Sequence, residues 1–193
     1  NKKRYDNIIT IEDPIEFIHQ HKKSIVDQRE VGLDTMSYES ALNSAMREAP
    51  DVILIGEIRD MKTMQEAIAY AETGHLCLST LHATNAYQAL ERIVNFFPEV
   101  VHQQVYEDIS SNLTAIVSQR LLAGKDGKRQ PATEIMLNSP YISELIHIGE
   151  IVKIRDAMER NKDVSMQTFD QSVFNLYNEG KVELEEALCN ADS

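Results

Sequence analysis

The feature that most constrains the fold is an alternation, in the first half of the chain, of short β-branched runs with amphipathic helical patterns. Val52–Ile55 is continuously apolar and mostly β-branched, which is typical of a strand buried on both faces. Ile8–Ile11 is predicted to be a strand, and Leu76–Leu81 is predicted to be a second buried strand. A further strand is expected near Ser24–Gln28. Strands that alternate with helices predict an α/β fold with a parallel sheet covered by helices.

The helices of the first half are bounded by recognisable start and stop residues. Capping side chains at one end and a glycine or proline at the other predict helices from Ser37 to Pro50, Asp60 to Gly74 and Asn85 to Pro98. Asn85 and Gln88 have the spacing of a capping box. The apolar stripe of the second helix is expected at Met61, Met64, Ile68 and Ala71.

The second half of the chain has a different pattern. The spacing of apolar residues predicts one long helix from about Val100 to Arg120, with Val101, Val105, Ile109 and Ile116 on one stripe. Gly124–Gly127 is typical of a hairpin turn, and Pro131–Leu137 of a last strand. From Pro140 onward only helical patterns remain. Two domains are therefore predicted, a core over residues 1–139 and a helical subdomain over residues 140–193.

The composition argues against several classes of partner. The formal net charge of −12 opposes unspecific attraction to nucleic acid or to an anionic bilayer. The apolar runs are far shorter than the ~18 residues of a membrane-spanning helix, so no direct membrane insertion is expected. The two cysteines, Cys77 and Cys189, form neither a disulfide framework nor a zinc pattern, which suits a reducing cytosol.

Titratable residues follow three of the predicted strands. Glu12 and Asp13 come after the first, Gly56 and Glu57 after the second, and His82 after the third. Ligands of an open parallel sheet bind at the carboxyl ends of its strands. If these strands are neighbours, two acids and an imidazole meet there and can hold Mg²⁺ or deprotonate a water. Gly56 fits a close approach of a nucleotide to the backbone.

Each of these residues also has a simpler interpretation. Glu57 alone is more often a solvated acid or a helix cap, and Glu12-Asp13-Pro14 alone is more often a turn. His75 and His82 suggest zinc, but an extended Leu76–Leu81 separates them by roughly 20 Å, too far to share one metal. His75 is then a helix-end residue or a contact to a neighbouring subunit. A free-standing metal-dependent hydrolase is a weaker alternative that uses only the acids and histidines.

Three ordered segments resemble a known family. Residues 9–17, 51–60 and 72–83, which read ITIEDPIEF, DVILIGEIRD and ETGHLCLSTLHA, look like the Asp box, Walker B motif and His box of the secretion ATPases. Within that superfamily the chain most resembles the PilT/PilU family of twitching-motility ATPases, which retract type IV pili. The resemblance covers nearly the whole chain and implies a RecA-like P-loop ATPase core.

The resemblance also implies roles for individual residues. Glu57 matches the Walker B acid that manages Mg²⁺ and the catalytic water, and Glu12 matches the Asp-box acid proposed as general base. Which of the two is the base stays open. His82 matches the His-box residue that senses the γ-phosphate. The residues expected to lie against the nucleotide are Asp13, Gly56, His75 and Arg59. Arg47, Arg59 and Arg92 all lie at family-like arginine positions, but for each one taken singly the interpretation as an ordinary surface or salt-bridge arginine is favoured.

The assembly implied by the resemblance is a cytoplasmic homohexameric ring. It lies peripherally at the inner membrane, docked on a pilus platform protein, and ATP hydrolysis with Mg²⁺ drives removal of pilin subunits. The alternative is a non-enzymatic accessory ring subunit that binds and supports a paralogous retraction ATPase.

Two departures from the family pattern qualify this expectation. The sequence contains no G-x-x-x-x-G-K-[ST] string, so the phosphate grip is missing, and the family's N-terminal PAS-like domain is also expected to be missing from it. The chain is therefore expected to be the C-terminal part of the ATPase and to be inactive alone. Tyr141–Ile146, Ala49–Asp51, Asn95–Pro98 and Ala191–Ser193 favour the accessory PilU-like branch over the main motor.

Overall fold

The computed structural model describes residues 1–160 and 166–192 and forms two compact units, Asn1–Leu81 and His82–Ser193. Residues 161–165 and Ser193, which belong to the expected helical subdomain, lie outside the described residues. The domain boundary expected between residues 139 and 140 falls inside the second unit, just before a helix, and stays a prediction.

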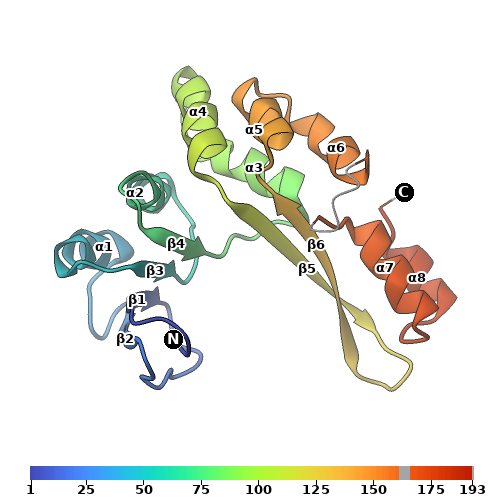
Figure 1. Ribbon diagram of the computed structural model, residues 1–193, viewed down its shortest axis with the longest axis horizontal. Helices are drawn as coiled ribbons and strands as arrows, with labels where there is room; N and C mark the ends of the chain where they lie inside the picture. Colours follow the sequence, from blue (N-terminus) through green and yellow to red (C-terminus); the bar gives the residue numbers. More distant parts are fainter. Residues whose placement is uncertain (161–165, 193) are drawn as a thin grey trace. The chain divides into compact units, whose positions relative to one another are not determined.

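The first unit is built on a four-stranded parallel sheet with the order β2-β1-β3-β4 (Figure 1). The strands are β1 (Asn7–Glu12), β2 (Ile25–Glu30), β3 (Val52–Ile55) and β4 (Leu76–Ser79). All three pairings are parallel. The predicted parallel α/β fold is therefore confirmed for this unit.

Two helices connect the strands of this sheet. They are α1 (Tyr38–Ala45), continued by the 3-10 turn η1 (Met46–Glu48), and α2 (Met61–Glu72). Ser37 caps α1 by accepting from the Ser40 amide, and Asp60 caps α2 by accepting from the Thr63 amide. Gly74 follows α2 with a φ of +90°, a conformation that favours glycine. The expected helix ends are confirmed.

Both helices cover the same face of the sheet. The crossovers from β2 to β3 and from β3 to β4 run in the same direction along the strand order, and right-handed crossovers then place both helices on one side. On that face Ile9, Ile11, Ile53 and Ile55 are at most 1% exposed. The buried Tyr70 hydroxyl of α2 donates to the Leu42 carbonyl of α1 at 2.6 Å and ties the two helices together.

The opposite face of the sheet corrects two sequence-based expectations. Val52 and Leu54 are only half-buried, so β3 is not buried equally on both faces. Leu76 and Leu78 of β4 are 49% and 46% exposed, so the expectation of a buried strand over Leu76–Leu81 is wrong. The reason is that β4 forms an edge and that no helix of this unit covers that face.

The buried stripe of α2 also differs from the expected stripe of Met61, Met64, Ile68 and Ala71. Its buried residues are Thr63, Met64, Ala67 and Tyr70.

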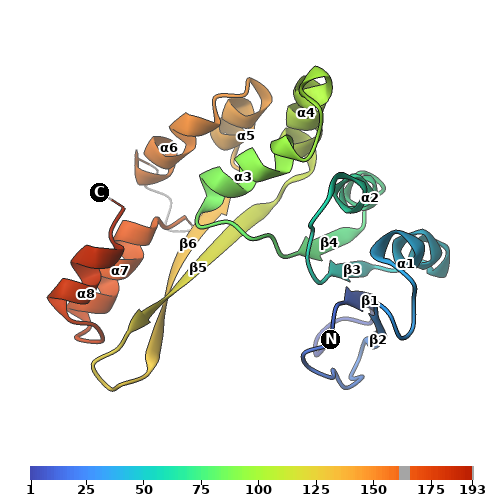
Figure 2. The same cartoon turned by 180° about the vertical axis from the view of Figure 1, so that it is seen from behind.

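The second unit consists of helices around an antiparallel hairpin, β5 (Ala115–Ala123) and β6 (Arg129–Leu137), as Figure 2 shows. The elements before the hairpin are α3 (Ala86–Asn95), the 3-10 turn η2 (Glu99–Val101) and α4 (His102–Asn112). The elements after it are α5 (Pro140–His147), the 3-10 turn η3 (Ile151–Lys153), α6 (Ile154–Arg160), α7 (Phe169–Asn178) and α8 (Leu184–Asn190). The helices expected beyond Pro140 are confirmed.

The single long helix expected from Val100 to Arg120 is wrong. The helix α4 ends at Asn112, and Ala115 begins a strand in which buried and exposed residues alternate. Ile116 lies seven residues after Ile109, which fits a helical stripe by coincidence. The predicted hairpin turn at Gly124–Gly127 and the predicted last strand are confirmed.

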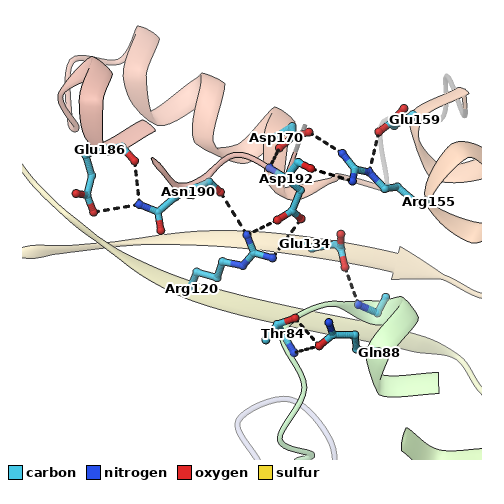
Figure 3. A network of polar contacts seen from close by, with 11 residues as sticks. Thr84, Gln88, Arg120, Glu134, Arg155, Glu159, Asp170, Glu186, Asn190 and Asp192 are labelled. Atoms are coloured by element: carbon cyan, nitrogen blue, oxygen red, sulfur yellow. Dashed lines mark hydrogen bonds and ion pairs between the residues drawn. The ribbon is translucent and has the colours of Figure 1, made fainter. Parts of the chain in front are cut away.

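Apolar packing and charged pairs together hold α7 and α8 against the hairpin. The apolar core of this region consists of Leu122, Ala132, Phe169, Val173, Leu176, Val182 and Ala187. The guanidinium of Arg120 lies 4.0 Å from the centre of the Phe169 ring. It also donates to both carboxylate oxygens of Asp192, at 2.6 and 3.1 Å (Figure 3). Arg155 of α6 donates to Asp170 at 3.0 Å, and the Asp170 carboxylate accepts from the Asp192 amide at 2.7 Å.

Side chains also fix the start of α3. Asn85 caps it by accepting from the Gln88 amide, as the capping-box spacing predicts. The Gln88 side chain accepts from the Thr84 hydroxyl at 2.6 Å, so the reciprocal half of the capping box goes to Thr84. Glu134 of β6, only 6% exposed, accepts from the Ala86 amide at 2.7 Å. Burial raises the pKa of the Glu134 carboxyl, and the hydrogen bond from Ala86 partly offsets that rise.

Candidate functional site

The carboxyl edge of the first unit's sheet gathers the acids singled out by the sequence. Glu12 is the last residue of β1, Asp13 follows it, and Glu57 lies two residues after β3. The two strands are hydrogen-bonded neighbours in register, with Ile11 opposite Ile55. The expectation that the first two strand ends lie side by side is therefore confirmed. The roles assigned to these acids stay predictions.

Two neighbouring side chains orient the Glu12 carboxylate. Its Oε1 atom accepts from the Thr10 hydroxyl at 2.6 Å and from the Gln28 amide group at 3.0 Å. The side chain is half-buried. Its Oε2 atom makes no hydrogen bond to any residue in the described ranges 1–160 and 166–192. One oxygen of Glu12 is thus fixed by the protein, and the other is available to a ligand or water.

Arg59 connects the acids that follow the two strands. Its Nε atom forms an ion pair with Oε1 of Glu57, and its Nη1 atom lies 3.7 Å from Oδ2 of Asp13. The Glu57 side chain is 14% exposed, whereas that of Arg59 is 62% exposed. An exposed cation beside two acids stabilises a fold little, because water screens the attraction. The same cation is well placed to neutralise added negative charge.

Gly56 has a structural reason to be glycine. Its amide donates to the Ile11 carbonyl at 2.7 Å, continuing the strand pairing. A Cβ atom at this position would lie 3.1 Å from the Ile11 carbonyl oxygen and 3.1 Å from the Tyr38 hydroxyl. Packing within the protein alone therefore requires a small residue here. The expectation that Gly56 marks a nucleotide contact stays a prediction.

The two histidines belong to different units of the chain. His82 is the first residue of the second unit, so its meeting with Glu12 and Glu57 stays a prediction. His75 precedes β4 and lies at the amino edge of the parallel sheet, opposite the edge that carries Glu12 and Glu57. Its Nδ1 atom is 2.9 Å from the Thr73 hydroxyl, and its ring packs edge-on against Tyr70. Within the first unit, the structure does not bring His75 to the acids, and its contacts favour the interpretation as a helix-end residue.

The donor set at the edge suits Mg²⁺ better than zinc. In the part of the chain that the structure describes, no three His, Cys, Asp or Glu side chains are arranged to hold a metal ion. Mg²⁺ needs fewer protein ligands, since it commonly uses one or two carboxylates and takes its other oxygens from phosphates and water. Glu57, with Glu12 beside it, fits that requirement.

Tyr38 is a neighbour of this edge that sequence reasoning missed. It is the first residue of α1, 18 positions before Gly56 in the chain, and its hydroxyl lies over Gly56. No pattern of spacing signals such a contact. Of the remaining family-like arginines, Arg47 lies in η1 of the first unit. Arg92 lies in α3 of the second unit, where its guanidinium is 5.9 Å from the Phe96 ring.

A parallel sheet with paired acids at its carboxyl edge is typical of an α/β ATPase domain, and comparisons with known proteins agree. Residues 1–140 match the type II/IV secretion system protein family, and the chain belongs to that family. Within it, the chain falls in the PilT/PilU group of type IV pilus ATPases. The resemblance inferred from the three motifs is therefore confirmed.

Individual relatives make the placement more specific. The chain is 55% identical over its whole length to the type IV pilus ATPase PilU of Pseudomonas aeruginosa, covering 51% of that protein. It is 44% identical to a twitching motility protein of Neisseria gonorrhoeae, again over its whole length and 52% of the relative. It is 41% identical to the retraction ATPase PilT of P. aeruginosa over 97% of the chain and 54% of the relative. The chain thus spans about half the length of these relatives.

Solved structures give the same picture. The pilus retraction motor PilT with bound ADP matches the whole chain with a TM-score of 0.92 at 42% identity, and the chain covers 54% of that structure. The ATPase DotB of Legionella pneumophila matches 98% of the chain, and 52% of its own length, with a TM-score of 0.87 at 21% identity, a likeness of fold alone. Among the described residues, no helix is long and apolar enough to cross a membrane.

Proposed function

We propose that the chain supplies the catalytic acids of a hexameric motor ATPase that hydrolyses ATP to drive type IV pilus retraction and twitching motility. One observation carries the proposal. Glu12, Asp13 and Glu57 lie at one carboxyl edge of a parallel sheet, in a chain 55% identical to a type IV pilus ATPase. Phosphoryl transfer needs a held metal ion and an oriented water, and neighbouring carboxylates serve both needs.

Three side chains have different roles in the proposed reaction. Glu57 holds Mg²⁺ and its waters, and Mg²⁺ when bound neutralises charge on the phosphates. Glu12, fixed through Oε1 by Thr10 and Gln28, accepts a proton from the attacking water at Oε2. Arg59 stabilises the negative charge that develops on the transferred phosphoryl group.

The other predicted residues complete the site in the whole protein. His82 contacts the terminal phosphate, and Asp13 and Gly56 line the approach of the nucleotide. His75, at the opposite edge of the sheet, would reach a nucleotide only from a neighbouring subunit. The sequence has no phosphate-binding loop string, so the chain alone is expected not to turn over ATP.

The same proposal includes the setting of the protein. We place it in a cytoplasmic homohexamer, peripheral at the inner membrane, docked on a pilus platform protein and working beside a paralogous retraction ATPase. The experiment below also tests the alternative of a non-enzymatic accessory subunit, because strong ATPase activity of the full-length protein alone would contradict that alternative.

The proposal is tested by ATP turnover and nucleotide binding of the full-length protein. Glu57→Gln should lower turnover by about three orders of magnitude or more while ADP binding persists. Glu12→Gln should lower turnover similarly but leave the Mg²⁺ dependence of binding unchanged, which would identify Glu12 as the base. Glu99→Gln, a change of an exposed acid in η2 outside the three motifs, is the matched control and should have no effect. Unchanged turnover of Glu57→Gln would contradict the proposal.

A further inference from the structure

Tyr38 brings a hydroxyl group to the acid edge from a different element. Tyr38 is the first residue of α1, the helix that follows β2 in the sequence, and it is half-buried. Its Oη atom lies 3.1 Å from where a Cβ atom of residue 56 would stand, and that same point is 3.2 Å from the Glu12 Cα atom. The hydroxyl is therefore immediately beside the ends of β1 and β3.

The surroundings of this hydroxyl are charged. Burial raises the pKa of the Tyr38 phenol, and the nearby carboxylates of Asp13 and Glu12 raise it further, while Arg59 opposes them. The phenol thus keeps its proton at neutral pH and acts as a hydrogen-bond donor. Two of these charged side chains, Glu12 and Arg59, take part in the proposed reaction.

The hydroxyl is not used by the fold. Tyr38 donates no hydrogen bond to any residue within the ranges 1–160 and 166–192, whereas Tyr70 donates to Leu42 at 2.6 Å and Tyr87 to Glu91 at 3.2 Å. A half-buried tyrosine hydroxyl normally finds a partner. Beside the end of β1 there is thus a donor without a described protein partner, and Oε2 of Glu12, the last residue of that strand, also makes no described hydrogen bond.

We propose that Tyr38 is a positioning residue of the site, whose hydroxyl donates a hydrogen bond to the water that Glu12 orients for attack on the terminal phosphate. The water donates one hydrogen to Glu12 Oε2 and accepts from Tyr38 with one lone pair, which leaves its second lone pair directed at phosphorus. The inference rests on the proposed function of the acid edge and adds a residue to it.

The test is the Tyr38→Phe variant of the full-length protein, measured by steady-state ATP hydrolysis and thermal unfolding. Loss of one positioning hydrogen bond should lower kcat about tenfold, with KM unchanged. The melting temperature should not fall, because the hydroxyl bonds no described protein group. Tyr70→Phe is the matched control. It removes a hydroxyl that does serve the fold, so the melting temperature should fall and kcat should stay the same.

Three results would overturn the inference. They are an unchanged kcat in Tyr38→Phe, a raised KM with unchanged kcat, and a fall in kcat accompanied by a melting-temperature loss like that of Tyr70→Phe. The Glu57→Gln variant distinguishes a wrong role for Tyr38 from a wrong proposed function. If Glu57→Gln abolishes hydrolysis and Tyr38→Phe changes nothing, only the role of Tyr38 is wrong. If Glu57→Gln hydrolyses ATP normally, the proposed function fails and the role of Tyr38 fails with it.

Discussion

The acid edge of the first unit and the polar network of the second unit use the same residue types in opposite ways. Arg120 is 23% exposed, holds both oxygens of Asp192 and stacks on the Phe169 ring. Arg59 is 62% exposed and approaches Asp13 only to 3.7 Å. An arginine that is mostly buried, paired to both oxygens of a carboxylate and stacked on a ring is part of the fold, whereas an exposed arginine beside acids contributes little to stability. The contrast separates charges that hold structure from charges available for chemistry.

The largest stability effect in this comparison is expected at Arg120. Arg120→Ala removes the bidentate ion pair and the ring contact and leaves Asp192 without its cation, so the free energy of unfolding should fall by about 2 kcal/mol. Arg120→Lys keeps the charge but neither the planar fork nor the stacking, and should lose about half as much. Urea denaturation measures both. A loss below about 0.5 kcal/mol for the alanine variant would show that the network is only a surface pair.

A smaller and pH-dependent effect is expected at Glu134. Its folded-state pKa lies above the ordinary value of 4.5, so folding favours the protonated acid. That contribution is fully present below the unfolded pKa and is lost as the pH rises through the folded pKa. Glu134→Gln keeps an acceptor for the Ala86 amide and removes this dependence, with a change below about 1 kcal/mol.

The Glu134 prediction is checked by urea denaturation over a pH series from about 4 to about 8. The variant should gain stability relative to the parent protein as the pH rises, because only the parent loses the contribution of the protonated acid. Comparing the two proteins at each pH cancels the titration of all other groups. A stability difference that stays constant over the series would contradict the raised pKa.

The smallest stability effect is expected at Arg59. Arg59→Ala breaks exposed pairs to Glu57 and Asp13, so the free energy of unfolding should change by less than about 0.5 kcal/mol. ATP turnover of the full-length protein should nevertheless fall by about tenfold or more, because a charge-stabilising group is lost. A stability loss equal to that of Arg120→Ala, with unchanged turnover, would make Arg59 structural and remove the contrast between the two regions.

The local signals of the sequence predict the fold well where one residue decides the outcome. Ser37, Asp60 and Asn85 cap the helices that they were expected to cap, since a cap needs only its own side chain and the next turn. Burial is harder to predict because it depends on which face the other elements cover. Leu76 and Leu78 are as apolar as Ile53, but only Ile53 lies under the helices.

The wrong helix over Val100–Arg120 has a different cause. On the inner face of β5, the two polar residues Ser118 and Arg120 follow one another between Ile116 and Leu122, so the apolar period of two is weak, while Ile116 happens to continue the helical stripe. The hairpin turn at Gly124–Gly127 was itself a usable signal, since a hairpin requires a strand on each side. A strand directly before Gly124 is incompatible with a helix that continues to Arg120.

The candidate site divides in the same way. Glu12, Asp13 and Glu57 were predictable, because residues that follow neighbouring parallel strands share one edge. Tyr38 was not, because it reaches Gly56 from a helix through packing that no spacing encodes. At Gly56 the Ile11 carbonyl and the Tyr38 hydroxyl already favour a residue without a Cβ atom, so glycine at this position does not by itself signal a nucleotide contact.

The most direct test of the account is a crystal structure of the full-length protein with Mg²⁺ and a non-hydrolysable ATP analogue. The account predicts that Glu57 lies within the metal's coordination shell, directly or through one water, and that Glu12 Oε2 and the Tyr38 hydroxyl both contact a water in line with the terminal phosphate. A nucleotide bound with its terminal phosphate away from the carboxyl ends of β1 and β3 would contradict it.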